Sequence, residues 1–222
     1  MFSFEAWWQI LTTKLPVFFQ GVSTTVELAL YTAIFGTLLG IVVALLRMSR
    51  VKLLQVLAGA YIEFLRGTPL LVQVLIVFYG LPQLGIKLPR MTAGTVALVI
   101  NSAAYMAEIV RSGIQAIDGG QTEASRSLGM NGAQTMIYII LPQAVKNILP
   151  AIGNEFVSII KESSILYTIG IYELTYQANK LASTNFRYLE TLTISALIYF
   201  VLTFTASRLL GMLERRMRRG DR

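Results

Sequence analysis

The sequence predicts an all-α membrane protein with five transmembrane helices. Hydrophobic residues make up 55% of the 222 residues, charged residues only 14%, and the mean hydropathy is +0.61. A soluble domain usually carries about 25% charged residues, so a chain this apolar cannot cover itself with polar surface. A helix needs about 20 mostly apolar residues to cross the lipid core, and five segments of the chain approach that length.

Four of these spans follow from apolar length, although charged residues interrupt some of them. They cover residues 26–46, 54–81, 91–110 and 189–210. The second contains Pro69, which has no backbone N–H and clashes with the preceding turn. We therefore expect a bend within the second span.

The fifth span, residues 148–171, has the weakest hydropathy because it contains Pro150, Glu155, Lys161 and Glu162. It is nevertheless needed. With four spans the basic C-terminal tail would lie on the same side of the membrane as the nearly uncharged N-terminus.

Lysine and arginine residues test this topology. With the N-terminus outside, twelve basic residues fall on the cytoplasmic side and five outside, as the positive-inside rule requires. The cytoplasmic set is Arg47, Arg50, Lys52, Arg111, Arg126, Lys146, Arg208 and five tail arginines, and the external set is Lys14, Lys87, Arg90, Lys180 and Arg187. We expect an external segment (1–19), a membrane domain (20–211) and a basic cytoplasmic tail (212–222) in the cytoplasmic, or inner, membrane of the cell.

Composition also excludes several kinds of activity. The chain has no Cys and no His, which removes thiolate and imidazole catalysis and the usual zinc ligands. No metal-spaced carboxylate cluster compensates, so a membrane-embedded enzyme is hard to assemble. We expect no enzyme activity, metal or cofactor on this chain, and no nucleic-acid partner, because the basic residues crowd a membrane flank.

The longest cytoplasmic connection, residues 112–146, has a helical pattern. Asp118 followed three residues later by Gln121 has the form of a capping box. A short helix is expected over residues 122–128, ending at Gly129 in a left-handed turn, with a second helix from about Ala133. From the residues alone, insertion into a groove of a soluble partner and simple contact with the membrane surface are equally good explanations.

The same loop carries a spaced motif. It resembles the EAA motif of ATP-binding-cassette (ABC) importer permeases, which reads E-A-A, three residues, G, nine residues, I, one residue, L-P. The matching residues are Glu123, Ala124, Ser125, Gly129, Ile139, Leu141 and Pro142. Every spacing agrees, and the one departure is Ser125 in place of the second alanine. A small residue at that position preserves close packing.

Residues 63–73 and 101–111 resemble the polar amino acid branch of this family, and the similarity extends over about residues 20–211. The resemblance implies a type I ABC importer transmembrane domain that moves polar amino acids. It also implies two ATPase subunits that bind ATP and Mg²⁺, a second permease subunit, identical or paralogous, and an external solute-binding protein. The residues that would couple to the ATPase are Glu123, Ala124, Ser125, Leu128 and Gly129. The chain has no G-x-x-x-x-G-K-[ST] loop to hold phosphates, so ATP hydrolysis would occur on another polypeptide.

Polar residues within the spans are candidates for the substrate path, because buried ionisable groups are costly unless paired or wet. In the third span, Asn101, Tyr105, Glu108 and Ser112 lie on one helical face. The alternative is a seam between helices with hydrogen-bonding side chains, in which Glu108 pairs with Arg66 or Arg111.

The fourth span repeats polar residues every four positions. Asn154, Ser158 and Glu162 form the repeat, with Glu155 and Lys161 beside it. Lys161 and Glu162 could pair with each other or offer the opposite charges that an amino-acid zwitterion requires. The equally weighted alternative places both at the outer interface, where long charged side chains reach water.

The second span offers a third group of candidates at its expected bend. Backbone amides freed near Gly67 and Thr68 could bind a carboxylate, since irregular backbone is tolerated beside water or protein. The alternative is a plain kink in which Glu63 and Arg66 pair. Gln73 is the better substrate candidate on this span. Acidic residues outnumber basic ones within the membrane, which favours a cationic or neutral polar amino acid.

A gradient-driven carrier or channel is the main alternative to the ATP-driven importer. Intramembrane glutamates could serve it as proton relays. It would leave the 118–142 loop without a purpose, and the two halves of the chain show no internal repeat of the kind that many carriers contain. The sequence therefore favours the importer.

Overall fold

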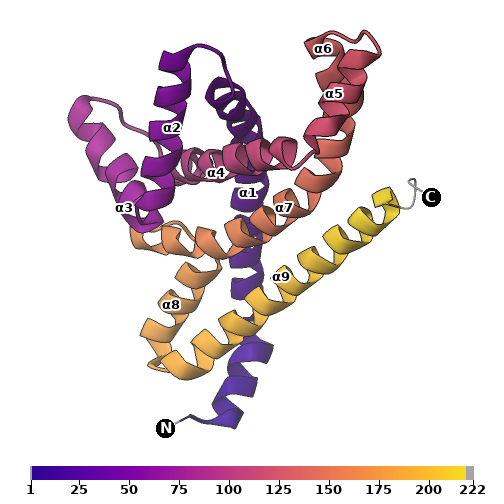
Figure 1. Cartoon of the computed structure of the whole chain (residues 1–222). Helices are drawn as coiled ribbons and strands as arrows, with labels where there is room; N and C mark the ends of the chain where they lie inside the picture. The colour runs from indigo at the N-terminus through magenta and orange to yellow at the C-terminus, as the bar shows by residue number, and fades with distance from the viewer. Residues whose placement is uncertain (1, 219–222) are drawn as a thin grey trace.

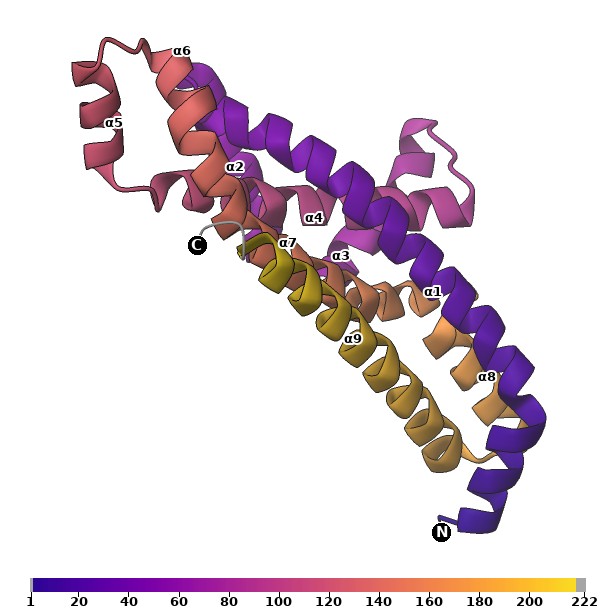
Figure 2. The ribbon, with the colours of Figure 1, turned by 90° about the vertical axis from the view of Figure 1, so that its right-hand side faces the viewer.

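The computed structural model describes residues 2–218, and every regular element among them is a helix (Figures 1 and 2). Four helices are long and apolar enough to cross a membrane, and one bent pair brings the number to five within the described residues. The prediction of an all-α protein with five spans is confirmed. The last part of the predicted basic tail, including Arg219 and Arg222, lies outside the described residues.

Helix α1 (Phe4–Arg47) is much longer than the first predicted span. Its 44 residues extend about 66 Å at 1.5 Å per residue, twice the thickness of the lipid core. The hydroxyl of Ser3 caps the helix by accepting the N–H of Ala6 at 3.3 Å. Residues 4–19, predicted as part of an external segment, are thus continuous with the first span, and Figure 2 shows α1 running along most of the molecule.

The second span is broken. Helix α2 (Lys52–Gly67) is followed by α3 (Leu70–Leu75), a π-helical turn η1 (Ile76–Gly80) and a 3₁₀ turn η2 (Leu81–Leu84). The two halves are bent by 107° at the residues between them, Thr68 and Pro69. The expected bend is confirmed at Pro69.

Helix α4 (Arg90–Gln115) is the centre of the molecule and packs closely against α1. Glycines on α1 make this approach feasible: a Cβ added at Gly40 would lie 2.4 Å from the Cβ of Met106, and one at Gly36 would lie 3.0 Å from the hydroxyl of Ser102. Real Cβ atoms do not approach so closely, so the two backbones are in contact only because these side chains are absent.

The loop predicted to be cytoplasmic forms a hairpin of helices. Helix α5 (Gly119–Ser127) leads into α6 (Gly132–Gln134), the π-helical turn η3 (Thr135–Ile140), α7 (Leu141–Glu162) and the 3₁₀ segment η4 (Ser163–Ile169). The helical run Gly132–Ile169 is the fourth span. It begins 16 residues before the predicted start at residue 148, because the helix continues unbroken from the hairpin into the span.

The caps of this hairpin differ in part from the prediction. Asp118 is the N-cap of α5 and accepts the N–H of Gly120 at 2.6 Å, but its predicted box partner Gln121 is instead directed to Gln143, 3.5 Å away. The capping box forms instead at the start of the next helix, α6, between Asn131 and Gln134. The predicted left-handed turn is confirmed, since Gly129 has φ +86°.

Two further helices follow: α8 lies toward the N-terminal end of the molecule, and α9 runs from there toward the opposite end, as Figure 1 shows. Helix α8 (Leu174–Asn185) was not predicted, and α9 (Tyr188–Arg218) is the last span. The carboxylate of Glu173 caps α8 by accepting the N–H groups of Thr175 and Tyr176 at 2.8 and 2.7 Å, and the hydroxyl of Tyr199 donates to it at 2.8 Å. This buried network joins α8 to α9.

Candidate functional site

The polar residues of α4 divide between three neighbouring elements. Asn101 faces α3, Ser102 faces α7, and Tyr105 faces the end of α2. The helical period places these residues on adjacent faces, whereas the neighbours that meet them come from distant parts of the chain. The predicted stripe is therefore a junction of elements rather than one open surface.

Gln73 and Asn101 hold the broken span together. The Gln73 amide nitrogen lies 2.8 Å from the carbonyl oxygen of Leu65, 3.1 Å from that of Thr68 and 2.9 Å from the Thr68 hydroxyl. Its amide oxygen accepts the Asn101 amide N–H at 2.9 Å. Both side chains are buried, at 7% and 4% exposure, so their hydrogen-bonding groups are used inside the protein.

Thr68 and Gly67, the other predicted residues at this break, differ from each other. The Thr68 hydroxyl donates to the carbonyl oxygen of Phe64 at 2.8 Å while it accepts from Gln73. Gly67 is exposed, and a Cβ built on it would meet nothing within 4 Å. The open backbone at the break is therefore at Gly67.

A carboxylate on α7 faces α4. The Ser102 hydroxyl donates to the Glu155 carboxylate at 3.2 Å, and the glutamate is half-buried. Ser158 and Glu162, both half-buried, follow at about one and two helical turns along α7. Ser102 was missed by sequence reasoning, because a serine in a helix often bonds its own backbone; its place beside Asn101 in the 101–111 motif was the available signal.

A guanidinium at the end of α2 reaches this junction. Arg66, in the last turn of α2, lies 5.4 Å from the ring centroid of Tyr105, within range of a cation–π contact. It also interacts electrostatically with Glu108 and Glu155, which belong to two different helices.

Glu108 itself is paired within its own helix. Its carboxylate makes a two-pronged hydrogen-bonded ion pair with Arg111, one turn away. The alternative in which Glu63 pairs with Arg66 is wrong, because no such ion pair forms among the described residues. Ser112 is exposed and its hydroxyl bonds the carbonyl oxygen of Ile109.

The remaining candidates on α7 lie in different surroundings. Lys161 is exposed and Glu162 half-buried, and no ion pair joins them in the described chain, since consecutive helical residues do not face each other. Asn154 lines a groove of about 250 Å³ between α7 and α9 with Gly153 and Ser207. It therefore does not share the surroundings of Glu155.

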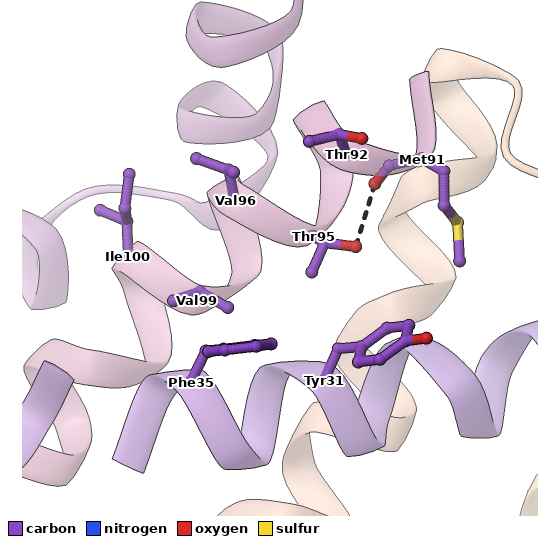
Figure 3. A pocket seen from close by; sticks show the side chains of 8 residues that line it. All are labelled: Tyr31, Phe35, Met91, Thr92, Thr95, Val96, Val99 and Ile100. Atoms are coloured by element: carbon purple, nitrogen blue, oxygen red, sulfur yellow. Dashed lines mark hydrogen bonds between the residues drawn. The ribbon is translucent and has the colours of Figure 1, made fainter. Parts of the chain in front are cut away.

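An apolar groove of about 490 Å³ lies apart from these polar groups, between α1 and the outer part of α4 (Figure 3). Tyr31 and Phe35 form one wall, and Val96 and Val99 are part of the other. The hydroxyl of Thr95 is directed to the carbonyl oxygen of Met91, 3.0 Å away. With no charged residue in its lining, this groove does not suit a polar solute.

The hairpin that begins with α5 projects from the bundle, as Figure 2 shows. Glu123, Ala124 and Gly129 are exposed, and the side chain of Leu128 is 85% exposed at the end of α5. Ser125 is buried, with 3% exposure. Four of the five residues predicted to couple to an ATPase are therefore accessible on the projecting hairpin.

Comparison with known proteins agrees with this architecture. A sequence model described as "Binding-protein-dependent transport system inner membrane component" matches residues 36–219. Among curated relatives, the probable amino-acid permease protein YxeN of Bacillus subtilis is 39% identical over 95% of both chains. The arginine transport system permease protein ArtQ of the same organism is 40% identical, over 94% of this chain and 95% of its own length.

Solved structures show the same fold. A crystal structure of an amino acid ABC transporter with histidines has a TM-score of 0.91 and 49% identity, over 97% of this chain and 99% of that one. The inward-facing MetNI methionine ABC transporter, 17% identical, has a TM-score of 0.69 over 90% of this chain and 97% of its own, and it shows the fold alone. The chain belongs to the family of binding-protein-dependent transport system inner membrane components.

Proposed function

We propose that this chain is the membrane-spanning permease subunit of an ATP-driven importer of polar amino acids. The observation that carries the proposal is the EAA-like motif on an exposed, projecting hairpin in a chain that has no phosphate-binding loop. Such a chain receives a conformational change from an ATPase. ATP and Mg²⁺ would therefore bind to a separate pair of ABC ATPase subunits.

The substrate class follows from the relatives and from the polar junction. Relatives are named as arginine and glutamine permeases, and the solved transporter at 49% identity was crystallised with histidines. Glu155 and Glu162 on α7 provide negative charge within the membrane. We infer a polar amino acid, with cationic ones favoured.

Opposite charges at the junction suit an amino-acid zwitterion. The ammonium group would bind near Glu155, Ser158 and Glu162, and the carboxylate near Arg66, with exposed Gly67 beside it. Tyr105 stacks against Arg66 and would orient its guanidinium. Gln73, Thr68 and Asn101 would shape the break rather than touch the solute.

The assembly and the orientation belong to the same proposal. One set of five spans is small for enclosing a polar path, so a second permease subunit, identical or paralogous, would complete it. An external solute-binding protein would deliver the amino acid. With the N-terminus outside and the C-terminus in the cytoplasm, in the cytoplasmic (inner) membrane, α5 lies on the ATPase side. The transmembrane domain would cover about residues 20–211.

Reconstitution tests the function. Purified permease, ATPase and solute-binding protein in liposomes should take up amino acid only with ATP and Mg²⁺, and Glu155→Gln should raise the KM about tenfold, as expected for about 1.4 kcal/mol of lost charge pairing. Glu27→Gln is the control, because Glu27 is exposed on α1. Uptake driven by an ion gradient without ATP would favour the carrier and overturn the importer.

A further inference from the structure

Helix α5 is attached to the rest of the hairpin at one buried side chain. Of the residues Gly119–Ser127, all described, eight are exposed and only Ser125 is buried, at 3% exposure. A force applied to α5 by a partner can reach the membrane helices either through the chain ends of α5 or through this contact.

The buried contact is a pair of hydroxyl groups. The Ser125 and Thr135 side-chain oxygens lie 3.0 Å apart, and Thr135 is 3% exposed. The Ser125 hydroxyl also lies 3.0 Å from the carbonyl oxygen of Thr122. If its single proton bonds that carbonyl, the Thr135 hydroxyl donates to Ser125, and both oxygens are satisfied without water.

Supporting contacts at the hairpin are weaker or local. The Gln143 amide nitrogen lies 3.5 Å from the Gln121 amide oxygen, an exposed contact at the limit of a hydrogen bond. The capping box between Asn131 and Gln134 shapes the connecting turn but does not touch α5. The hydroxyl pair is therefore the short, water-excluded link between the two arms of the hairpin.

Thr135 lies near the start of the helical run Gly132–Ile169, which reaches the polar junction. It is the first residue of η3, a π-helical turn, and the run continues through α7 to Glu155 and Glu162. The 20 residues from Thr135 to Glu155 extend about 30 Å at 1.5 Å per residue. The π turns of α-helices are frequent at functional sites. Here the π turn η3 lies between the hydroxyl pair and the polar junction.

We propose that Ser125 and Thr135 are positioning residues whose hydrogen bond fixes α5 to η3, which continues into α7, so that movement of α5 by an ATPase moves the helix that carries Glu155. This rests on the proposed function. The EAA motif that the loop resembles has alanine at the position of Ser125, which has no hydroxyl. The link is thus a feature of this chain and not of the motif.

The assembled importer in liposomes tests the proposal by the number of amino acids moved per ATP hydrolysed. Ser125→Ala and Thr135→Val should each lower that ratio about fivefold, as expected when one hydrogen bond is lost, while ATPase subunits still co-purify. Thr135→Ser keeps the hydroxyl and should restore the ratio. Ser127→Ala is the matched control, because the Ser127 hydroxyl bonds the Glu123 carbonyl of its own helix and no other group among residues 2–218.

Hydrogen exchange gives a second measurement on the folded protein. Amides of residues 119–127 should exchange about fivefold faster in Ser125→Ala than in Ser127→Ala, with other helices unchanged. A transport ratio within 1.5-fold of the unsubstituted protein in both hydroxyl-deleting variants would overturn the link, as would loss of ATPase binding in them or unchanged exchange. Failure of ATP-dependent uptake by the unsubstituted protein would instead refute the proposed function, and the exchange comparison would still decide whether the link exists.

Discussion

The two sides of α4 are built in opposite ways. Toward α1 the contact is close, because Gly40 leaves room for the side chain of Met106. Toward α2, α3 and α7 the same helix presents an amide, a phenol and a carboxylate, from Asn101, Tyr105 and Glu108. Ser102 lies at the border between the two sides, against Gly36 of α1 and with its hydroxyl donating to Glu155 of α7. One helix thus separates a rigid support from a polar junction.

The polar side contains two kinds of group. In closed groups the hydrogen-bonding atoms are used inside the protein, and in open groups some of them remain available to a solute. Gln73 and Asn101 bond each other and the broken backbone, and little of either is exposed. Glu155 has the Ser102 hydroxyl as its hydrogen-bond donor among the described residues and retains further acceptor capacity. The difference teaches that a polar residue within a membrane protein is informative about transport only after its partners are known.

The largest effect is expected from a substitution that breaks the close contact between α1 and α4. Gly40→Ala should destabilise the fold by about 3 kcal/mol, because its Cβ would lie 2.4 Å from that of Met106 and overpacking is costly. Gly211→Ala is the matched control, with nothing within 4 Å of the new Cβ. Thermal unfolding in detergent measures both. Equal melting temperatures would mean that α1 and α4 are not rigidly packed.

The second prediction concerns the closed polar groups. Gln73→Leu should cost about 2.5 kcal/mol, because Asn101 and the Leu65 carbonyl lose their buried partner. Uptake should fall through loss of folded protein, with little change in the KM of the remainder. Gln83→Leu, an exposed position, is the control. A raised KM with unchanged stability would instead show that Gln73 lines the substrate path.

A third prediction extends the comparison to a closed carboxylate outside the five spans. Burial raises the pKa of Glu173 to about 6 despite three hydrogen-bond donors. Because its folded pKa exceeds the ordinary 4.5, the stability it contributes is complete below pH 4.5 and is lost as the pH rises through 6, about 2 kcal/mol in all.

Melting temperatures measured from pH 4 to pH 8 check the sign of this effect. The unsubstituted protein should lose stability across that window, and Glu173→Gln should remove the part of the loss that this carboxyl contributes, since the amide does not titrate. A melting temperature that instead rises with pH in the unsubstituted protein alone would show that the hydrogen bonds outweigh the burial of Glu173.

The smallest effect is expected at the ion pair on α4. Both partners of the Glu108–Arg111 pair are about a quarter exposed, at 27% and 28%, and exposed pairs contribute less than about 1 kcal/mol. Glu108→Gln should therefore change the melting temperature by no more than a few degrees and leave the KM unaltered. A large rise in KM would place Glu108 with the open groups.

Much of the fold could be predicted from local pattern. Four spans follow from runs of about 20 apolar residues, and the fifth from the side of the membrane that the basic tail requires. The bend follows from Pro69, and the turn after α5 from Gly129, whose φ is +86°. Helix α8 could not, because its N-cap Glu173 is buried in a network that includes Tyr199, 26 residues away. The extension of the fourth span before residue 148 was also missed, since its hydropathy is low.

The sequence by itself determined that lipid surrounds the chain, how many spans it has, on which helical face each polar residue lies, and the motif of the hairpin that contains α5. These properties depend on stretches of chain about as long as one helical span, over which hydropathy and the 3.6-residue period can be read. Tertiary structure alone decided which polar groups are closed. Asn101 meets Gln73 across 28 residues and Ser102 meets Glu155 across 53, and a helical period fixes the direction of a side chain but not the neighbour that packing brings to it.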